Sequence, residues 1–284
     1  MMIKMPEDKY QLKAAFTRAA VYAASAVSVM SLDRADALLT LVFATGIAAY
    51  SAWNTKKKYG RRFGAMPELD EDHHIVQAAK RFSARAGVKA PSVRVQMGGE
   101  EKPLIDFVGT TNQYMIVNAS KFLNERNLSE EEKDGTIAHE IAHIEHRDVT
   151  HGQIDNAAYI ALCISTMGMA AEQVMQGRIA QALLSSSILP LVVLASRYVD
   201  RQTEYSADQR GFELTDDKEA LISGFRHFNY VSGEGELRDM VHGHPIATKL
   251  LNVYLAINEI FSEHPMGQKR IAALEEYSKV YKPS

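Results

Sequence analysis

The most regular feature of the chain is a set of apolar runs that contain no charged residue. They cover residues 19–32, 37–55, 156–171 and 179–196. A helix needs about 20 residues to cross a hydrocarbon core about 30 Å thick, so only the second run comes close without flanking side chains that reach back to the surface. Two interpretations compete: two membrane-spanning helical hairpins, or a cleavable signal peptide at the first run with buried core helices at the third and fourth. The charged connector Asp33–Asp36 leads directly into another apolar run, which favours a hairpin over a processing site.

The segments between these runs predict short strands and amphipathic helices. Residues 71–86 have helical periodicity, which a glycine and a proline then end. Strand patterns follow at 92–97, 104–109 and 113–118, with turn residues at Gly98-Gly99 and Thr110-Thr111-Asn112. We expect a small, mostly antiparallel sheet. After residue 204 we expect only helices, apart from a loop at 232–235, with His264-Pro265 beginning the last helix.

The best-defined helix starts near Glu130. Ser129 precedes three glutamates and forms a capping box with Glu132, which satisfies free N–H groups and places acidic side chains at the positive end of the helix dipole. Apolar residues then recur at helical spacing, interleaved with histidines. One side of this helix should pack in the core and the other should line a cleft.

The histidines of this helix follow the pattern H-E-x-x-H, at His139, Glu140 and His143. Because positions four apart share a helical face, two imidazoles can grip one metal ion while Glu140 faces its open side. His146 shares the face, but the rise of about 1.5 Å per residue puts it about 10 Å from His139 along the axis. We therefore expect His146 to support a ligand or cap the helix, and a third ligand to come from elsewhere.

A pair of carboxylates later in the chain offers that ligand. Glu204 and Asp208 are four residues apart and share a helical face. Glu204 can complete a two-histidine, one-glutamate site, while Asp208 can accept a hydrogen bond from a ligand histidine and fix its tautomer. The alternative is an exposed charged helix in which Glu204 pairs with Arg201 and Asp208 faces solvent.

Together the motifs resemble those of the HtpX-like membrane zinc metallopeptidases, which are relatives of the CAAX prenyl endopeptidases. The resemblance covers residues 75–276 and rests on His139 to Asp148, on Arg201 to Asp208 with Gly211, and on His264-Pro265 followed by Arg270-Ile271 and Leu274. It implies an α+β, mainly helical fold: a zincin-type catalytic domain with transmembrane helical hairpins. It also implies a gluzincin-type site that holds one zinc ion per chain.

The resemblance further implies a role for each site residue. The zinc ligands would be His139, His143 and Glu204. Glu140 would be the general base, taking a proton from water and passing it to the departing amine. Asp208 would orient a ligand histidine, His264 would donate to the developing oxyanion, and Arg270 would have a structural role. The simpler interpretation of the His264-Pro265 pair is a helix start, as at His244-Pro245.

The chain departs from this family on the strand that borders the cleft. Where relatives carry an Asn-Ala-Phe segment, this sequence has Ile105-Asp106-Phe107. An extended substrate pairs with such a strand through main-chain hydrogen bonds, which survive a change of side chain. We therefore expect hydrolysis to be retained with a different substrate preference. The alternative is a membrane-tethered zinc-containing binding protein without turnover.

Composition narrows the possible functions. With 284 residues, 46% of them hydrophobic, the chain can bury a full core. Its net charge of −3 gives no bulk electrostatic reason to bind nucleic acid, and its one cysteine, Cys163, excludes an internal disulfide framework. The basic cluster at 56–62 suits a juxtamembrane anchor on anionic lipid better than a nucleic-acid site.

These observations predict a membrane hairpin over residues 1–62 and a zinc metalloprotease domain over 63–284, interrupted by a second apolar hairpin at about 156–196. Positive residues flank the first hairpin on both outer sides, so the catalytic domain should face the cytoplasm. The resemblance implies an integral protein of the bacterial inner membrane that cuts misfolded membrane proteins. A third hypothesis is a prenyl-protein endopeptidase, which would favour more membrane spans.

Overall fold

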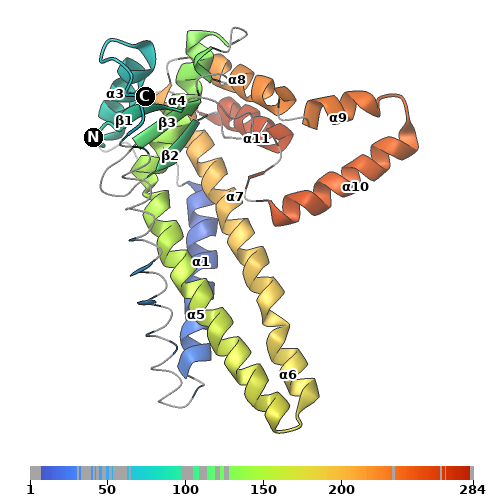
Figure 1. Cartoon of the computed structure of the whole chain (residues 1–284). Coiled ribbons are helices and arrows are strands. Elements are labelled where there is room, and N and C mark those ends of the chain that lie inside the picture. The colour runs from blue at the N-terminus through green and yellow to red at the C-terminus, as the bar shows by residue number, and fades with distance from the viewer. Residues whose placement is uncertain are drawn as a thin grey trace. The chain divides into compact units, whose positions relative to one another are not determined.

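The computed structural model describes residues 8–30, 32, 40, 42, 45–46, 49–50, 53, 63, 65–96, 105–108, 114–118, 122–124, 128–215, 217–231, 234–262, 264–265 and 267–281. The chain divides into two compact units (Figure 1). The first unit consists of residues 1–56 and 150–203, and the second of residues 57–149 and 204–284. Helices α5 and α7 each continue from one unit into the other.

Helices dominate both units. The first unit holds α1 (Lys9–Met30), most of α5 (Asp148–Met175), α6 (Ile179–Ser186) and the first part of α7 (Ile188–Leu214). The second unit holds the end of α7 and the elements α3 (His74–Ala86), β1 (Ser92–Gln96), β2 (Ile105–Val108), β3 (Tyr114–Asn118), α4 (Glu130–His146), α8 (Lys218–Val231), α9 (Glu234–Met240), α10 (Pro245–Phe261) and α11 (Gly267–Val280).

The sheet is mixed, which corrects the expectation of a mostly antiparallel one. Its strand order is β1-β3-β2, with β2 antiparallel and β1 parallel to β3. Strand β3 reverses direction after β2 and enters between the two earlier strands, so it runs the same way as β1. Each strand bound lies within one residue of its prediction, whereas the expected turns at 98–99 and 110–112 fall outside the described residues.

The core of the second unit explains why α4 is held firmly. Ile137 and Ile141, one turn apart on α4, are fully buried with Phe82 of α3 and Met115 of β3. Burying a side chain of this size contributes about 1.5–3 kcal/mol. The apolar stripe predicted for this helix is confirmed, and its other face is left to carry polar groups.

The predicted start of α4 is also confirmed. The Oγ of Ser129 accepts a hydrogen bond from the Glu132 N–H at 3.2 Å, and Glu132 Oε2 accepts one from the Ser129 N–H at 2.9 Å. The other oxygen of Glu132 accepts from the hydroxyl of Ser223 on α8 at 2.6 Å. The cap therefore also ties α4 to α8.

The C-terminal helices differ slightly from prediction. Helix α9 begins at Glu234, so the expected loop at 232–235 is wrong for its last two positions, while 232–233 lie outside the described residues. Acidic residues near a helix start favour helix there. Helix α10 begins with Pro245 at its first turn, and α11 begins at Gly267, two residues after the predicted Pro265.

In the first unit, polar contacts join α1 to α5. Asp155 of α5 accepts hydrogen bonds from Arg18 Nε at 2.9 Å and from the Tyr22 hydroxyl at 2.5 Å. Ser28 and Ser165 share a hydrogen bond of 2.7 Å further along the same two helices. The buried carboxylate is thus paired, as buried charges need to be.

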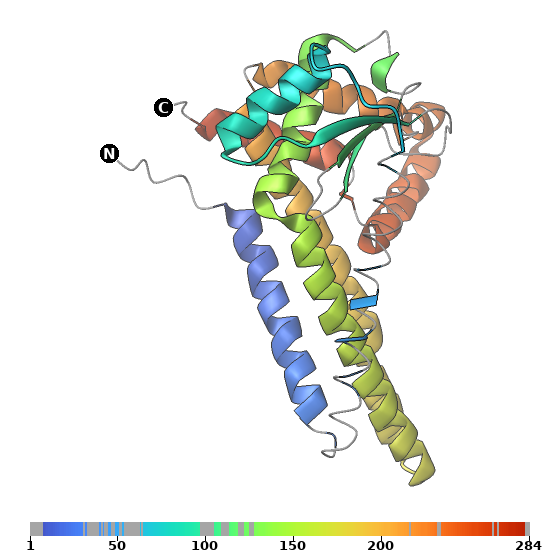
Figure 2. The ribbon, with the colours of Figure 1, turned by 60° about the vertical axis from the view of Figure 1, so that its left-hand side comes forward.

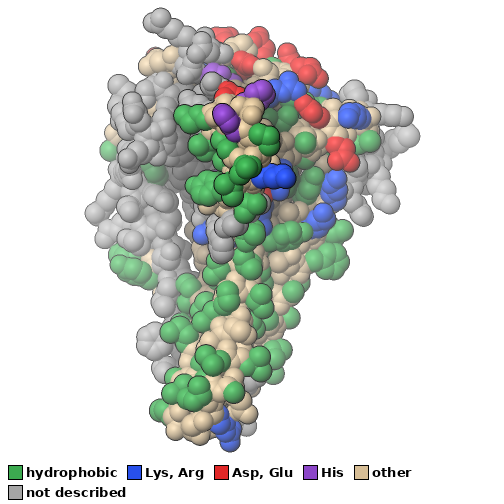
Figure 3. Space-filling view, turned by 90° about the vertical axis from the view of Figure 1, so that its right-hand side faces the viewer, with side chains coloured by type: hydrophobic (Ala, Val, Ile, Leu, Met, Phe, Trp, Pro, Cys, Tyr) green, Lys and Arg blue, Asp and Glu red, His purple; other side chains and the backbone are tan. Residues whose placement is uncertain are grey.

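Helices α6 and α7 run back beside α5 after a turn at 176–178 (Figures 1 and 2). Within the described residues, two helical stretches are long and apolar enough to cross a bilayer: Asp148–Met175, and Ile179–Leu214, in which an 18-residue window has a mean hydropathy of 1.9. In the most apolar 18 residues of these two stretches, only 33% and 11% of the positions are buried. The core helix of a soluble protein would be mostly buried, so that interpretation fits both stretches poorly. Figure 3 shows hydrophobic side chains gathered over this unit. The expected span at 37–55 lies outside the described residues, except for single positions.

Candidate active site

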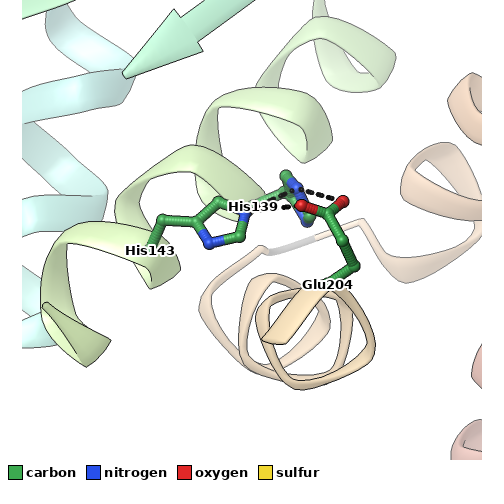
Figure 4. A group of neighbouring side chains, drawn as sticks. All are labelled: His139, His143 and Glu204. Carbon is green, nitrogen blue, oxygen red and sulfur yellow. Dashed lines mark hydrogen bonds and ion pairs between the residues drawn. The ribbon is translucent and has the colours of Figure 1, made fainter. Parts of the chain in front are cut away.

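Helices α4 and α7 bring together three side chains of the types that bind metal ions. His139 and His143 lie one turn apart on α4, and Glu204 projects toward both from α7 (Figure 4). One ligand atom from each lies within 4.8 Å of the others. Within the described residues, this is the group of histidine, cysteine and acidic side chains whose geometry could hold a metal ion.

The spacing of the donor atoms fits a tetrahedral metal. The two Nε2 atoms of His139 and His143 are 3.1 Å apart, and they lie 3.8 and 3.5 Å from oxygens of Glu204. Ligands about 2.0–2.2 Å from a tetrahedral zinc ion lie about 3.4 Å from one another. Two imidazoles and a carboxylate are also the donor types that zinc takes in hydrolases.

Glu204 is buried, so the alternative of an exposed charged helix is wrong. Its exposed fraction is 8%, and that of Asp208 is 1%. Asp208 lies where the sequence analysis expects it, with Oδ1 2.9 Å from the Nδ1 of His139. A histidine that donates from Nδ1 keeps Nε2 free for a metal, so this contact selects the useful tautomer.

Asp148 does the same for the second histidine, a role that the sequence does not predict. Its Oδ2 lies 2.7 Å from the Nδ1 of His143. Asp148 is five residues after His143, off the shared helical face. It returns to the histidine because Arg147 ends α4 in the left-handed conformation, with φ of 57°. Spacing along one helix could not reveal this contact.

Arg270 of α11 lies inside the site rather than only supporting the fold. Its Nε and a terminal nitrogen donate to the two oxygens of Asp208 at 2.9 and 2.6 Å, and another nitrogen lies 3.3 Å from Glu204. The guanidinium also lies 4.6 Å from the ring centre of Phe225. This cation is therefore shared between a predicted ligand and the carboxylate that orients His139.

Three other residues were predicted for the site, and they differ in how close they lie to the donor side chains of His139, His143 and Glu204. His264 contacts Glu204 at 3.2 Å, with 67% of its side chain exposed. Glu140 is partly buried on α4, directly after His139. His146 lies away from the donor group, with its Nδ1 3.4 Å from the hydroxyl of Ser206 on α7.

The charges of the site oppose the effect of burial on its carboxylates. Burial alone would raise the pKa of Glu204, but Arg270 and His143 outweigh it and hold that pKa well below its usual value. Burial would likewise raise the pKa of Asp208, while Arg270 and His139 lower it overall. Both carboxylates are therefore ionised at neutral pH, as ligation and orientation require.

The basic groups that pair with these carboxylates have raised pKa values. Burial lowers the pKa of His143, yet its contacts with Asp148 and Glu204 raise it well above the usual value. Burial also lowers the pKa of Arg270, and the charges of Asp208 and Glu204 raise it above the usual value. A metal at this site would have to displace a proton from His143.

Strand β2 carries the unusual Ile105-Asp106-Phe107 segment and forms an edge of the described sheet. Asp106 pairs in register with Ile116 of β3. An edge strand offers main-chain groups with which an extended peptide can pair.

Comparison with known sequences yields consistent matches. The profile of peptidase family M48 matches residues 70–278. A protease HtpX homolog of Paraburkholderia phytofirmans is 30% identical over 257 residues, which cover 85% of this chain and 87% of that protein. Protease HtpX homologs of Burkholderia multivorans and Ralstonia pickettii are each 28% identical, over 85% and 87% of this chain and 87% and 88% of their own.

Proposed function

Because the chain belongs to peptidase family M48 and is an HtpX-like metalloendopeptidase, we propose that it cuts peptide bonds with a zinc ion held by His139, His143 and Glu204. The observation that supports this best is the spacing of the three donors, 3.1–3.8 Å apart, which matches the edges of a zinc tetrahedron. The ion would be one per chain.

The protein side chains would divide the work of hydrolysis. Zinc, when bound, acidifies a water molecule and polarises a carbonyl group. Glu140 takes the proton of the attacking water and delivers it to the departing amine, so no acyl-enzyme is formed. Asp208 and Asp148 hold the imidazoles by their Nδ1 atoms. His264, exposed beside Glu204, donates to the oxyanion that develops on the substrate.

We also propose that the protein is embedded in a membrane by two helical hairpins. The stretches Asp148–Met175 and Ile179–Leu214 have the length and hydropathy of spanning helices. We assign residues 1–62 to an N-terminal membrane hairpin and 63–284 to the protease domain, which the hairpin at about 156–196 interrupts. Positive residues outside the first hairpin support a catalytic domain on the cytoplasmic side of a bacterial inner membrane.

The proposed substrates are proteins or peptides, in particular misfolded membrane proteins cut at exposed cytoplasmic segments. The edge strand β2 supports an extended, unfolded substrate, because such a strand pairs through main-chain groups whatever the substrate's side chains. Nothing in the net charge of −3 supports nucleic acid as a partner.

The test uses the full chain purified in detergent, with zinc or with chelator, on an unfolded protein and on a C-terminally lipidated peptide. We expect zinc-dependent cleavage of the unfolded protein. Cleavage of the lipidated peptide alone would favour a prenyl-protein endopeptidase, and bound zinc without any cleavage would favour a binding protein.

The matched control is Glu140→Gln, which keeps the size of the side chain and removes the base. Its zinc content should stay near wild type while cleavage falls about 10²–10⁴-fold. Cleavage at the wild-type rate would contradict the role of Glu140.

A further inference from the structure

The contact between α4 and α7 is built from one face of α7. Glu204, Ala207, Asp208 and Gly211 occupy positions i, i+3, i+4 and i+7 of one helical face, and all four are buried. On this face, the two carboxylates Glu204 and Asp208 are interleaved with alanine and glycine, the two smallest residues. Small residues allow two helices to approach closely.

Gly211 lies close against the backbone of α4 at His139, a predicted metal ligand. A Cβ atom added to Gly211 would lie 3.0 Å from both the Cα and the backbone nitrogen of His139, and 3.4 Å from the carbonyl carbon of Ala138. These are backbone atoms in the middle of α4, which cannot rotate away as a side chain could. Any side chain here would have to push α7 away from His139.

The distance between α4 and α7 determines whether the carboxylates of α7 reach the histidines of α4. Asp208 lies about one turn before Gly211 and contacts His139 at 2.9 Å, and Glu204 lies about two turns before it. A carboxylate side chain has a fixed length, and ligand distances in a metal site must be correct to about 0.2 Å. Relieving a 3.0 Å contact to an ordinary one of about 3.4 Å needs a shift of about 0.4 Å, which exceeds that tolerance.

We propose that Gly211 is a positioning residue of the metal site, whose missing side chain sets the distance between α4 and α7 at which Glu204 and Asp208 meet the two histidines. This inference rests on the proposed function, because it concerns the same site. It adds a residue that carries no metal-binding atom and that acts only through the helix spacing.

The chain offers matched glycine controls. Gly224 of α8 packs against the other end of α4, where an added Cβ would lie 3.2 Å from the backbone oxygen of Glu132. Gly168 of α5 has no atom within 4 Å of its added Cβ. Gly224→Ala therefore reports the effect of a tight contact away from the donors, and Gly168→Ala reports the effect of an alanine in open space.

The experiment titrates Co²⁺ into full-length protein in detergent, after the resident metal has been removed with a chelator. Affinity comes from competition with a chromophoric chelator, geometry from the visible absorption of bound Co²⁺, and fold from thermal unfolding without metal. We expect Gly211→Ala to weaken Co²⁺ binding at least tenfold and to change its spectrum. Gly224→Ala should lower the unfolding temperature while affinity stays within twofold of wild type, and Gly168→Ala should change neither.

Two outcomes would overturn the inference: a Gly211→Ala protein with wild-type affinity and spectrum, or an equal loss of affinity in Gly224→Ala. Ala207→Ser, which adds one oxygen to the same face a turn earlier, keeps the test decisive if the first variant does not fold. A several-fold loss of affinity in it supports the inference, and unchanged affinity refutes it. Failure of the wild-type chain to bind Co²⁺ would instead overturn the proposed metal site itself.

Discussion

Replacing Arg270 with methionine should destabilise the metal-free protein strongly. The substitution keeps most of the apolar stem but removes the cation that contacts Asp208 at 2.6 and 2.9 Å and Glu204 at 3.3 Å. The side chains of these three residues are 16%, 1% and 11% exposed, so water cannot replace the lost partner. Removing one member of such a buried pair costs about 3–5 kcal/mol, because the remaining charge stays buried.

This loss converts to a fall in unfolding temperature of about 6–20 °C for a domain of this size. The assay is thermal unfolding of Arg270→Met in detergent with chelator, and then with zinc. Zinc should recover part of the loss, because its charge compensates Glu204 in place of the guanidinium. Arg270→Lys, which keeps the charge but not the two-pronged contact, should lose less.

The loss of stability in Arg270→Met should also depend on pH in a defined direction. In the wild type, Arg270 holds the pKa of Asp208 and Glu204 below their usual values against the effect of burial, so it stabilises the fold above about pH 4. Without it, only the histidine contacts oppose burial, so both pKa values rise relative to wild type and the fold loses part of the stability that it has above about pH 4. The gap between variant and wild type should therefore be large at pH 7 and shrink toward pH 4. A gap below 1 kcal/mol at pH 7, or one that grows on acidification, would refute the reasoning.

Four further predictions test the rest of the site and its setting. Glu204→Ala should lose the metal in elemental analysis, and unchanged zinc would mean that another group is the third ligand. Asp148→Asn should weaken metal binding about 10–100-fold, measured by chelator competition, because it no longer fixes the tautomer of His143. Since the pKa of His143 is raised, metal binding should release a proton at pH 7 and tighten as pH rises; equal calorimetric heats in buffers of different protonation enthalpy would contradict this. A tag in the turn at 176–178 should be cut by protease from the side opposite the cytoplasm, and cutting from the cytoplasmic side would exclude a spanning hairpin.

Local spacing predicted those parts of the structure that lie within one element. The start of α4, its apolar stripe and the shared face of His139 and His143 all follow from helical periodicity. The carboxylate pair Glu204 and Asp208 is visible for the same reason. Which of them contacts which histidine is a matter of how α7 crosses α4, and a sequence alone does not contain that angle.

What the sequence could not predict depends on backbone direction between elements. Asp148 reaches His143 only because Arg147 takes a left-handed conformation, which is uncommon outside glycine, asparagine and aspartate. The parallel pairing of β1 with β3 depends on where β3 enters the sheet, and strand patterns are the same for either direction. Arg270 lies 62 residues after Asp208 along the chain, so local spacing does not predict its contact with that carboxylate.

That distance along the chain has a consequence for how the protease is made. Asp208 leaves the ribosome 62 residues ahead of Arg270, which at 5–20 residues per second is a delay of about 3–12 s. During this interval Asp208 and Glu204 lack the guanidinium that lowers their pKa values in the folded protein. A newly made chain therefore acquires the complete arrangement of Asp208, Glu204 and Arg270 only after the helix that carries Arg270 has been synthesised and has docked.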